Sequence, residues 1–77
     1  MKEKCYCTSD LSLAAYLRVK GFHLSGIRRI SYNKASFEFE DSRDLSDQVL
    51  RFFNGKCLVP PLKYWETVKS LKAMIYN

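Results

Sequence analysis

Residues 27–41 read IRRISYNKASFEFED and decide the fold, because two β-like runs flank a short polar turn. With Asn33 and Lys34 as a two-residue loop, the runs form a β-hairpin whose opposed residues alternate between two faces. One face then carries the pairs Tyr32/Ala35, Ile30/Phe37 and Arg28/Phe39, and the other carries Ser31/Ser36, Arg29/Glu38 and Ile27/Glu40. The first face is mostly apolar, and we expect it to lie on the core.

Three helices are predicted around this hairpin. Thr8 or Ser9 caps the first helix, which carries Asp10 in its first turn and ends at Gly21, a residue suited to the left-handed closing position. The second helix begins after Asp41 or Ser42 and ends at residues 54–55, and the third begins at Pro61. The apolar spacing predicts three core-facing sets: Leu13, Ala14, Leu17 and Phe22; Leu45, Val49, Phe52 and Phe53; Tyr64, Val68, Leu71 and Ile75.

Short strands are predicted at residues 4–8 and 56–59, on either side of this central part. The element order is then β-α-β-β-α-β with an added C-terminal helix, which is the ferredoxin-like split arrangement in one α+β domain over residues 1–77. If residues 56–59 form only an extended link, the architecture becomes a three-stranded sheet packed by three helices. Both alternatives are α+β.

The charge is uneven along the chain. Its 77 residues carry a net charge of +5. Residues 38–47 hold five acids and one arginine, whereas the segments before and after them are basic. A basic protein of this kind is attracted to polyanions such as nucleic acid.

Composition also bears on location and chemistry. No apolar run approaches the roughly 20 residues that span a bilayer, and the first residues lack the apolar core of a signal peptide, so we expect a cytoplasmic protein with no membrane partner. The three cysteines, Cys5, Cys7 and Cys57, are expected to be reduced, buried and structural. With His23 as the single histidine, no metal site and no cofactor is expected.

No catalytic constellation is evident, and we expect a protein that is not an enzyme. The acidic residues 38–47 have structural duties at the sheet and at a helix start, and no local signature pairs His23 with a cysteine. The outer face of the hairpin carries Ser36, Glu38 and Glu40 where an RNA-recognition sheet needs aromatic rings.

Two functions remain open. The first is nucleic-acid binding through phosphate contacts by Arg18, Lys20, Arg28 and Arg29, with a second basic set at Lys63, Lys69 and Lys72. The alternative is a protein interaction module that forms a homodimer or binds a host protein, with the aromatic anchors Tyr64, Trp65 and Tyr76.

Several segments resemble a family of short, uncharacterised bacterial and phage proteins. The resemblance rests on Thr8-Ser9-Asp10 with residues 13–17, on Gly21-Phe22, on residues 37–41, and on a terminal helix with Trp65, Leu71, Lys72, Ile75 and Tyr76. It spans most of the chain, and its motifs are helix caps and core positions. It implies a prokaryotic or mobile-element setting, and it implies no activity, cofactor or site residue.

Overall fold

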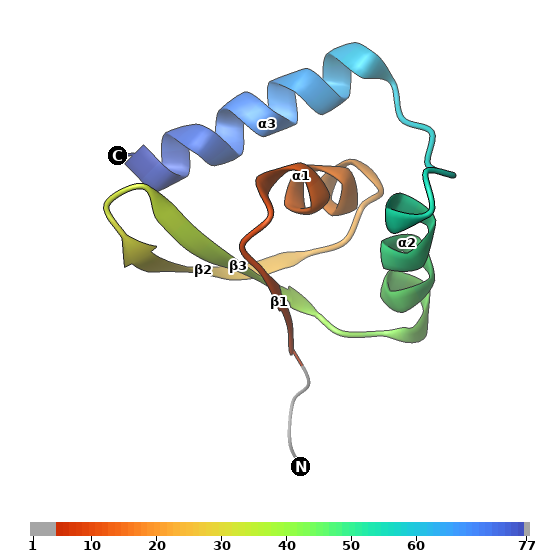
Figure 1. Ribbon diagram of the computed structural model, residues 1–77, viewed down its shortest axis with the longest axis horizontal. Helices are drawn as coiled ribbons and strands as arrows, with labels where there is room; N and C mark the ends of the chain where they lie inside the picture. Colours follow the sequence, from red (N-terminus) through yellow and green to blue (C-terminus); the bar gives the residue numbers. More distant parts are fainter. Residues whose placement is uncertain (1–4, 77) are drawn as a thin grey trace.

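A computed structural model describes residues 5–76 and is α+β, as predicted (Figure 1). Three strands form one sheet; two of the three helices are stacked over one of its sides, and the other stands beside its end (Figure 1). In chain order the elements are β1 (Cys5–Thr8), α1 (Leu11–Val19), β2 (Leu24–Ser31), β3 (Lys34–Glu40), α2 (Arg43–Phe53) and α3 (Pro61–Tyr76).

The sheet is antiparallel with the strand order β1-β3-β2, so β3 is its central strand. Ala35, Phe37 and Phe39 alternate along β3 and are buried on the face that the helices cover. Ser36 and Glu38 point to the opposite face, which no described element covers. This alternation is the period of two that the sequence predicts for β3.

The predicted hairpin is present, but its predicted register is wrong. The loop consists of Tyr32 and Asn33, and Ile27 rather than Ile30 lies opposite Phe37. A change of register by one residue moves every side chain to the other face, and the observed register turns Arg28 to the open face and half-buries Ile27. The pairing is also interrupted at Ser25 and at Ile30.

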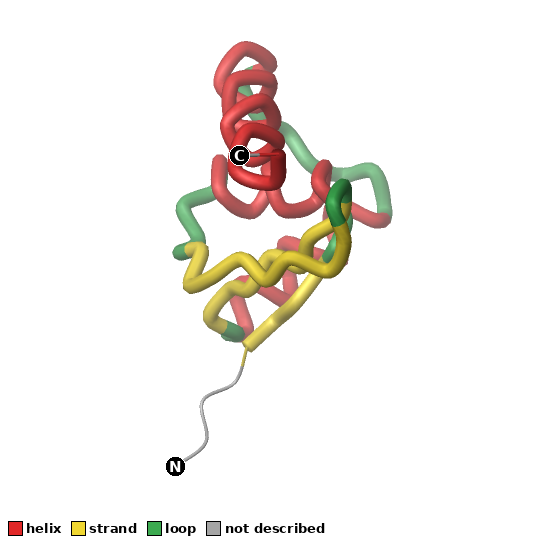
Figure 2. Tube along the Cα trace, turned by 90° about the vertical axis from the view of Figure 1, so that its left-hand side faces the viewer, coloured by secondary structure: helices red, strands yellow, loops and turns green. Residues whose placement is uncertain are grey.

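Helix α1 is the centre of the molecule, because it lies between the sheet and α3 (Figures 1 and 2). Its five consecutive residues 13–17 are all buried, as expected for a helix with packing partners on every side. Asp10 is the N-cap, rather than Thr8 or Ser9, and its carboxylate accepts hydrogen bonds from the backbone N–H groups of Ser12 and Leu13 at 3.0 and 3.3 Å. An anionic cap suits the positive end of the helix.

The C-terminal end of α1 forms the turn that the sequence predicts. Gly21 has a φ of 98°, in the left-handed region, and the N–H of Phe22 donates to the carbonyl of Leu17 at 3.1 Å. This is the hydrogen bond of a Schellman ending, in which glycine avoids the cost that a Cβ would add. The turn directs the chain into β2.

Helix α2 packs mainly on α1. Ser42 is its N-cap, and its hydroxyl accepts a hydrogen bond from the N–H of Leu45 at 3.1 Å. Leu45 is buried, and Val49 and Phe52 are half-buried against the core, as predicted. Phe53 was predicted in the same buried stripe, and this is wrong: its side chain is 64% exposed. Because α2 packs mainly against one element, α1, only part of its apolar surface is covered.

Residues 56–60 connect α2 to α3 without joining the sheet, so the three-stranded alternative is the one observed within residues 5–76. Helix α3 then begins at Pro61, as predicted, and lies across α1 with Leu71 and Ile75 buried. Tyr64 and Val68 are half-buried on the same side. No helix in the described part of the chain is long and apolar enough to cross a membrane.

Candidate nucleic-acid interface

Basic side chains gather around the last turn of α1. Arg18 and Lys20 lie two positions apart, which turns them to nearly opposite sides of a helix with 3.6 residues per turn. The guanidinium of Arg18 donates to the carbonyl oxygen of Phe22 at 2.9 Å, and this hydrogen bond fixes the side chain against the turn. Each of the two cations therefore faces a different flank of α1.

The wider of the two flanks is a hollow of about 550 Å³, which we call the α1–α3 cleft. The end of α1, the start of β2 and one side of α3 form it. Its lining residues are Arg18, Val19, His23, Leu24, Lys63, Glu66, Thr67, Ser70, Leu71 and Met74.

The α1–α3 cleft combines positive charge with hydroxyl groups and an apolar floor. Arg18 and Lys63 supply the charge from two different helices, and Glu66 is the single acid in the lining. The hydroxyl of Thr67 donates to the carbonyl oxygen of Lys63 at 2.9 Å, and the hydroxyl of Ser70 lies one turn further along α3. Such a surface combines cationic hydrogen-bond donors for an anionic group, Arg18 and Lys63, with apolar side chains.

The other flank is a smaller hollow of about 160 Å³, which we call the α1–α2 cleft. Lys20 from α1, Arg51 from α2 and Lys56 from the connection converge on it, and its lining contains no acid. The buried Tyr16 forms its base and donates its hydroxyl hydrogen to the side-chain carbonyl of Gln48. The ammonium of Lys20 lies 5.7 Å from the centre of the Tyr16 ring, within reach of a cation–π interaction.

These cleft cations have no carboxylate partner within residues 5–76. The ion pair of the described chain joins Arg28 to Glu38 at 3.7 Å, on the open face of the sheet. Glu66 lies in the α1–α3 cleft, but five other acids lie away from both clefts, namely Glu38 and Glu40 on β3 and Asp41, Asp44 and Asp47 at the start of α2. The charge is therefore segregated, with the positive side at the C-terminal end of α1.

The two hairpin arginines lie apart from this positive side. Arg28 is paired with Glu38, where the sequence predicted Arg29, because the observed register places Arg28 beside that carboxylate. Arg29 donates to the carbonyl oxygen of Tyr32 at 3.3 Å. The four predicted phosphate contacts thus divide into two at the clefts and two on the hairpin.

Sequence reasoning missed part of each cleft. Arg51, Lys56 and His23 carry no local motif, and they reach the clefts only because α2 and the connection pack beside α1. Lys63 was grouped with Lys69 and Lys72 in a second basic set, yet it faces the α1–α3 cleft while those two are exposed on α3 outside that lining. The crossing of α3 over α1, which separates Lys63 from the other two, is a tertiary feature.

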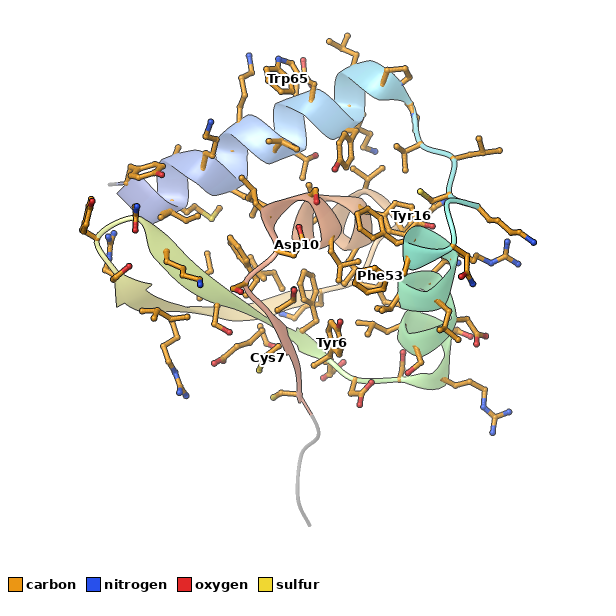
Figure 3. The ribbon with its side chains drawn as sticks, in the orientation of Figure 1. Tyr6, Cys7, Asp10, Tyr16, Phe53 and Trp65 are labelled. Carbon is orange, nitrogen blue, oxygen red and sulfur yellow. The ribbon has the colours of Figure 1, made fainter. Side chains whose placement is uncertain are left out.

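The three predicted aromatic anchors differ in how exposed their side chains are. Tyr64 is half-buried and donates its hydroxyl hydrogen to the carbonyl oxygen of Ser12 at 3.0 Å, so it helps to fix α3 on α1. Trp65 is 56% exposed and points away from α1 (Figure 3), and Tyr76 is 59% exposed. Only Trp65 and Tyr76 are therefore available as anchors for a partner.

Three tyrosines are perturbed by their surroundings. Burial raises the pKa of Tyr6, and the nearby carboxylates Asp10 and Asp41 raise it further. Burial likewise raises the pKa of Tyr16 and of Tyr64, although Arg51 opposes the shift at Tyr16. All three phenols are held in the neutral form, which suits packing and hydrogen bonding.

The thiols do not form a site. Cys57 is half-buried against the core, but Cys5 and Cys7 are exposed, so the expectation that all three are buried is wrong for two of them. Both lie on the open face of the edge strand β1, opposite Glu40 and Glu38 of β3. Within residues 5–76, no three side chains of His, Cys, Asp or Glu are grouped to hold a metal ion.

A comparison with known protein families assigns the chain to one of them. A family described as a domain of unknown function, DUF5659, matches residues 3–77, and the chain belongs to this family. The resemblance to an uncharacterised family, seen in the sequence, is thereby confirmed. No curated protein and no solved structure matches the chain.

Proposed function

We propose that this protein is a small accessory protein, not an enzyme, that binds nucleic acid through the basic side chains of the α1–α3 and α1–α2 clefts. The single observation that carries the proposal is that five cations from α1, α2, α3 and the connection converge there, and none has a carboxylate partner in the described chain. They are Arg18, Lys20, Arg51, Lys56 and Lys63.

The geometry favours phosphate contacts at the helices over base stacking on the sheet. The open face of the sheet presents Cys5, Cys7, Ser36 and Glu38, which are thiols, a hydroxyl and an acid, rather than aromatic rings. On this face Arg28 is paired with Glu38, whereas the cations of the clefts have no carboxylate partner in the described chain and attract a phosphate backbone. This difference favours contacts with a polyanion at the C-terminal end of α1.

The setting that we propose is the cytoplasm of a prokaryote or of a phage-infected cell. The resemblance to bacterial and phage sequences supports it. A basic chain that exposes many charged side chains also suits a compartment that contains nucleic acid.

The test is a salt series on the wild-type protein with labelled single-stranded RNA, single-stranded DNA and duplex DNA. Each phosphate contact contributes about 0.9 to the slope of log affinity against log salt for duplex DNA and about 0.7 for single strands. Three or more contacts therefore predict a slope of about −2.7 or steeper with duplex, and little dependence on base sequence. If none of the three probes binds at roughly 50 mM salt, where such contacts are strongest, the proposal is overturned.

A second candidate is a module that binds a host protein through the outer side of α3. Leu62, Trp65 and Tyr76 are exposed on this helix, and Lys69 and Lys72 lie between them. Aromatic side chains anchor protein interfaces through the large apolar area that they bury.

Binding to a host protein would depend on these aromatics and would change little with salt. Trp65→Ala should then abolish co-purification of a partner from nuclease-treated extract, whereas Lys69→Ala should not. Nucleic-acid binding predicts the reverse pattern, in which nuclease removes the captured material and Trp65→Ala has no effect.

A further inference from the structure

We propose that two copies of this protein pair through the free edges of their β1 strands, in antiparallel orientation, and form one continuous six-stranded sheet. The starting observation is the strand order β1-β3-β2, which leaves β1 at one rim of the sheet with β3 as its one described neighbour (Figures 1 and 2). In the complete split β-α-β arrangement a fourth strand would lie at this rim, and residues 56–60 do not supply it.

The two edges of the sheet differ in how well they are protected against pairing. The β2 edge carries Arg28 and Arg29, and its pairing is interrupted near Ser25 and Ile30. Charges and irregularities of this kind are the features by which proteins prevent edge-to-edge association. The β1 edge consists of Cys-Tyr-Cys-Thr, which is uncharged, and its pairing with β3 is uninterrupted over all four residues. The β1 edge is thus open to a further strand.

The same contrast identifies the occupant as a second copy of β1. Pairing of β1 with the protected β2 edge of another copy would be head-to-tail and would not close, whereas β1 with β1 is a closed two-fold contact. Two uncharged strands meet without like-charge repulsion. The backbone N–H and C=O groups of the rim then gain partners that they lack in the single chain.

The proposed pairing brings cysteines of the two copies together in more than one register. Hydrogen bonds across a two-fold antiparallel pair require the two opposed positions to be both odd or both even, because side chains alternate along a strand. Cys5 and Cys7 are both odd, so every register that overlaps the centre of β1 places a cysteine of one copy opposite a cysteine of the other. Opposed Cα atoms then lie about 4.5 to 5.5 Å apart, a separation that a disulfide spans.

The first test uses the thiols as reporters. In Cys57→Ser, treatment with copper–phenanthroline in air should convert most chains to a species of twice the 9.0 kDa chain mass that a reductant reverses. The copper complex passes the two electrons released for each disulfide to dioxygen, and the two thiol protons leave with them. The matched control is Cys5→Ser with Cys7→Ser, which retains Cys57 and should remain uncrosslinked. The proposal is overturned if the first variant stays monomeric or if the control crosslinks equally.

The second test separates pairing between copies from folding. In Cys5→Lys with Cys7→Lys, each new ammonium faces Glu40 or Glu38 of its own β3 but a like charge of the other copy. Light scattering at the highest soluble concentration should give twice the chain mass for wild type and for the double serine variant, and the single chain mass for the double lysine variant. A monomeric wild type or a dimeric lysine variant overturns the proposal. Should the lysine variant fail to fold, the crosslinking result still decides.

Discussion

The two ends of α1 lie in the same short helix but differ in almost every physical respect. Its middle and start are enclosed by the sheet and by α3, and residues 13–17 are buried without a gap. Its last turn opens to solvent between two clefts and carries cations with no carboxylate partner in the described chain. The enclosed part contributes stability, and the open part is free to serve binding, so changes in one should leave the other nearly unaffected.

The largest expected effect lies in the core that encloses the buried part of α1. Phe39 is fully buried on the covered face of the sheet, so Phe39→Ala should lower the free energy of unfolding by about 3 to 5 kcal/mol. Urea unfolding followed by circular dichroism measures this change. The matched control is Tyr32→Ala in the hairpin loop, where the side chain is 81% exposed and no loss is expected. A Phe39→Ala protein as stable as wild type would contradict the assignment of the core.

Two neighbouring phenylalanines of α2 sharpen the comparison. The ring of Phe52 lies 5.5 Å from that of the buried Tyr16, whereas Phe53 is mostly exposed. Phe52→Ala should therefore cost about 2 to 3 kcal/mol, below the range for a fully buried ring, and Phe53→Ala less than about 1. The two variants are compared in the same urea titration. Equal losses would show that α2 is rotated relative to the orientation described here.

The N-terminal cap of α1 gives a smaller effect. Asp10→Ala removes the carboxylate that accepts from two backbone N–H groups, and it should cost about 1 kcal/mol. Ser9→Ala is the control, because Ser9 is exposed and is not the cap. Differential scanning calorimetry of both variants is the measurement. If Ser9→Ala proves the more damaging of the two, the cap is misassigned.

Alkaline pH tests the buried tyrosines. In the folded state the pKa values of Tyr6, Tyr16 and Tyr64 are raised above the ordinary value of 10.0. The folded state therefore binds these phenolic protons more tightly than the unfolded state does. Their contribution to stability is fully present below pH 10 and is lost as the pH rises through their pKa in the folded state. The melting temperature should therefore fall as the pH rises above 10, and it should fall less steeply in Tyr64→Phe than in wild type. Tyr32→Phe, a change at an exposed position of the hairpin loop, is the control.

Local signals predicted most of the elements. The alternation of Phe37 and Phe39, the glycine at position 21 and the proline at position 61 each act within a few residues, and the structure has each where it was expected. The hairpin register was missed because the interruptions at Ser25 and Ile30 depend on burying Ile27 instead of Arg28. The fourth strand predicted at residues 56–59 does not form, because a β-like composition says nothing of whether the chain returns to the sheet.

The candidate site was less predictable than the fold. A cluster of charge in the sequence grouped Arg18 and Lys20 with Arg28 and Arg29, but a helix and a hairpin carry these pairs to different sides of the molecule. The cations that do converge, such as Lys63 with Arg18, lie 45 residues apart in the chain and meet only through helix packing. Tertiary packing, rather than local pattern, decides which charges act together.

The measurement that tests this account most directly compares two matched charge reversals in nucleic-acid affinity. Arg18→Glu with Lys63→Glu changes the α1–α3 cleft, and Arg28→Glu with Arg29→Glu changes the hairpin by the same total charge. Dissociation constants for one labelled single-stranded oligonucleotide are measured at roughly 50 mM salt, with circular dichroism as the check on folding. We expect the cleft variant to lose at least about tenfold more affinity than the hairpin variant, because two contacts turn into repulsions. Equal losses, or a greater loss in the hairpin variant, would contradict the assignment of the interface to the C-terminal end of α1.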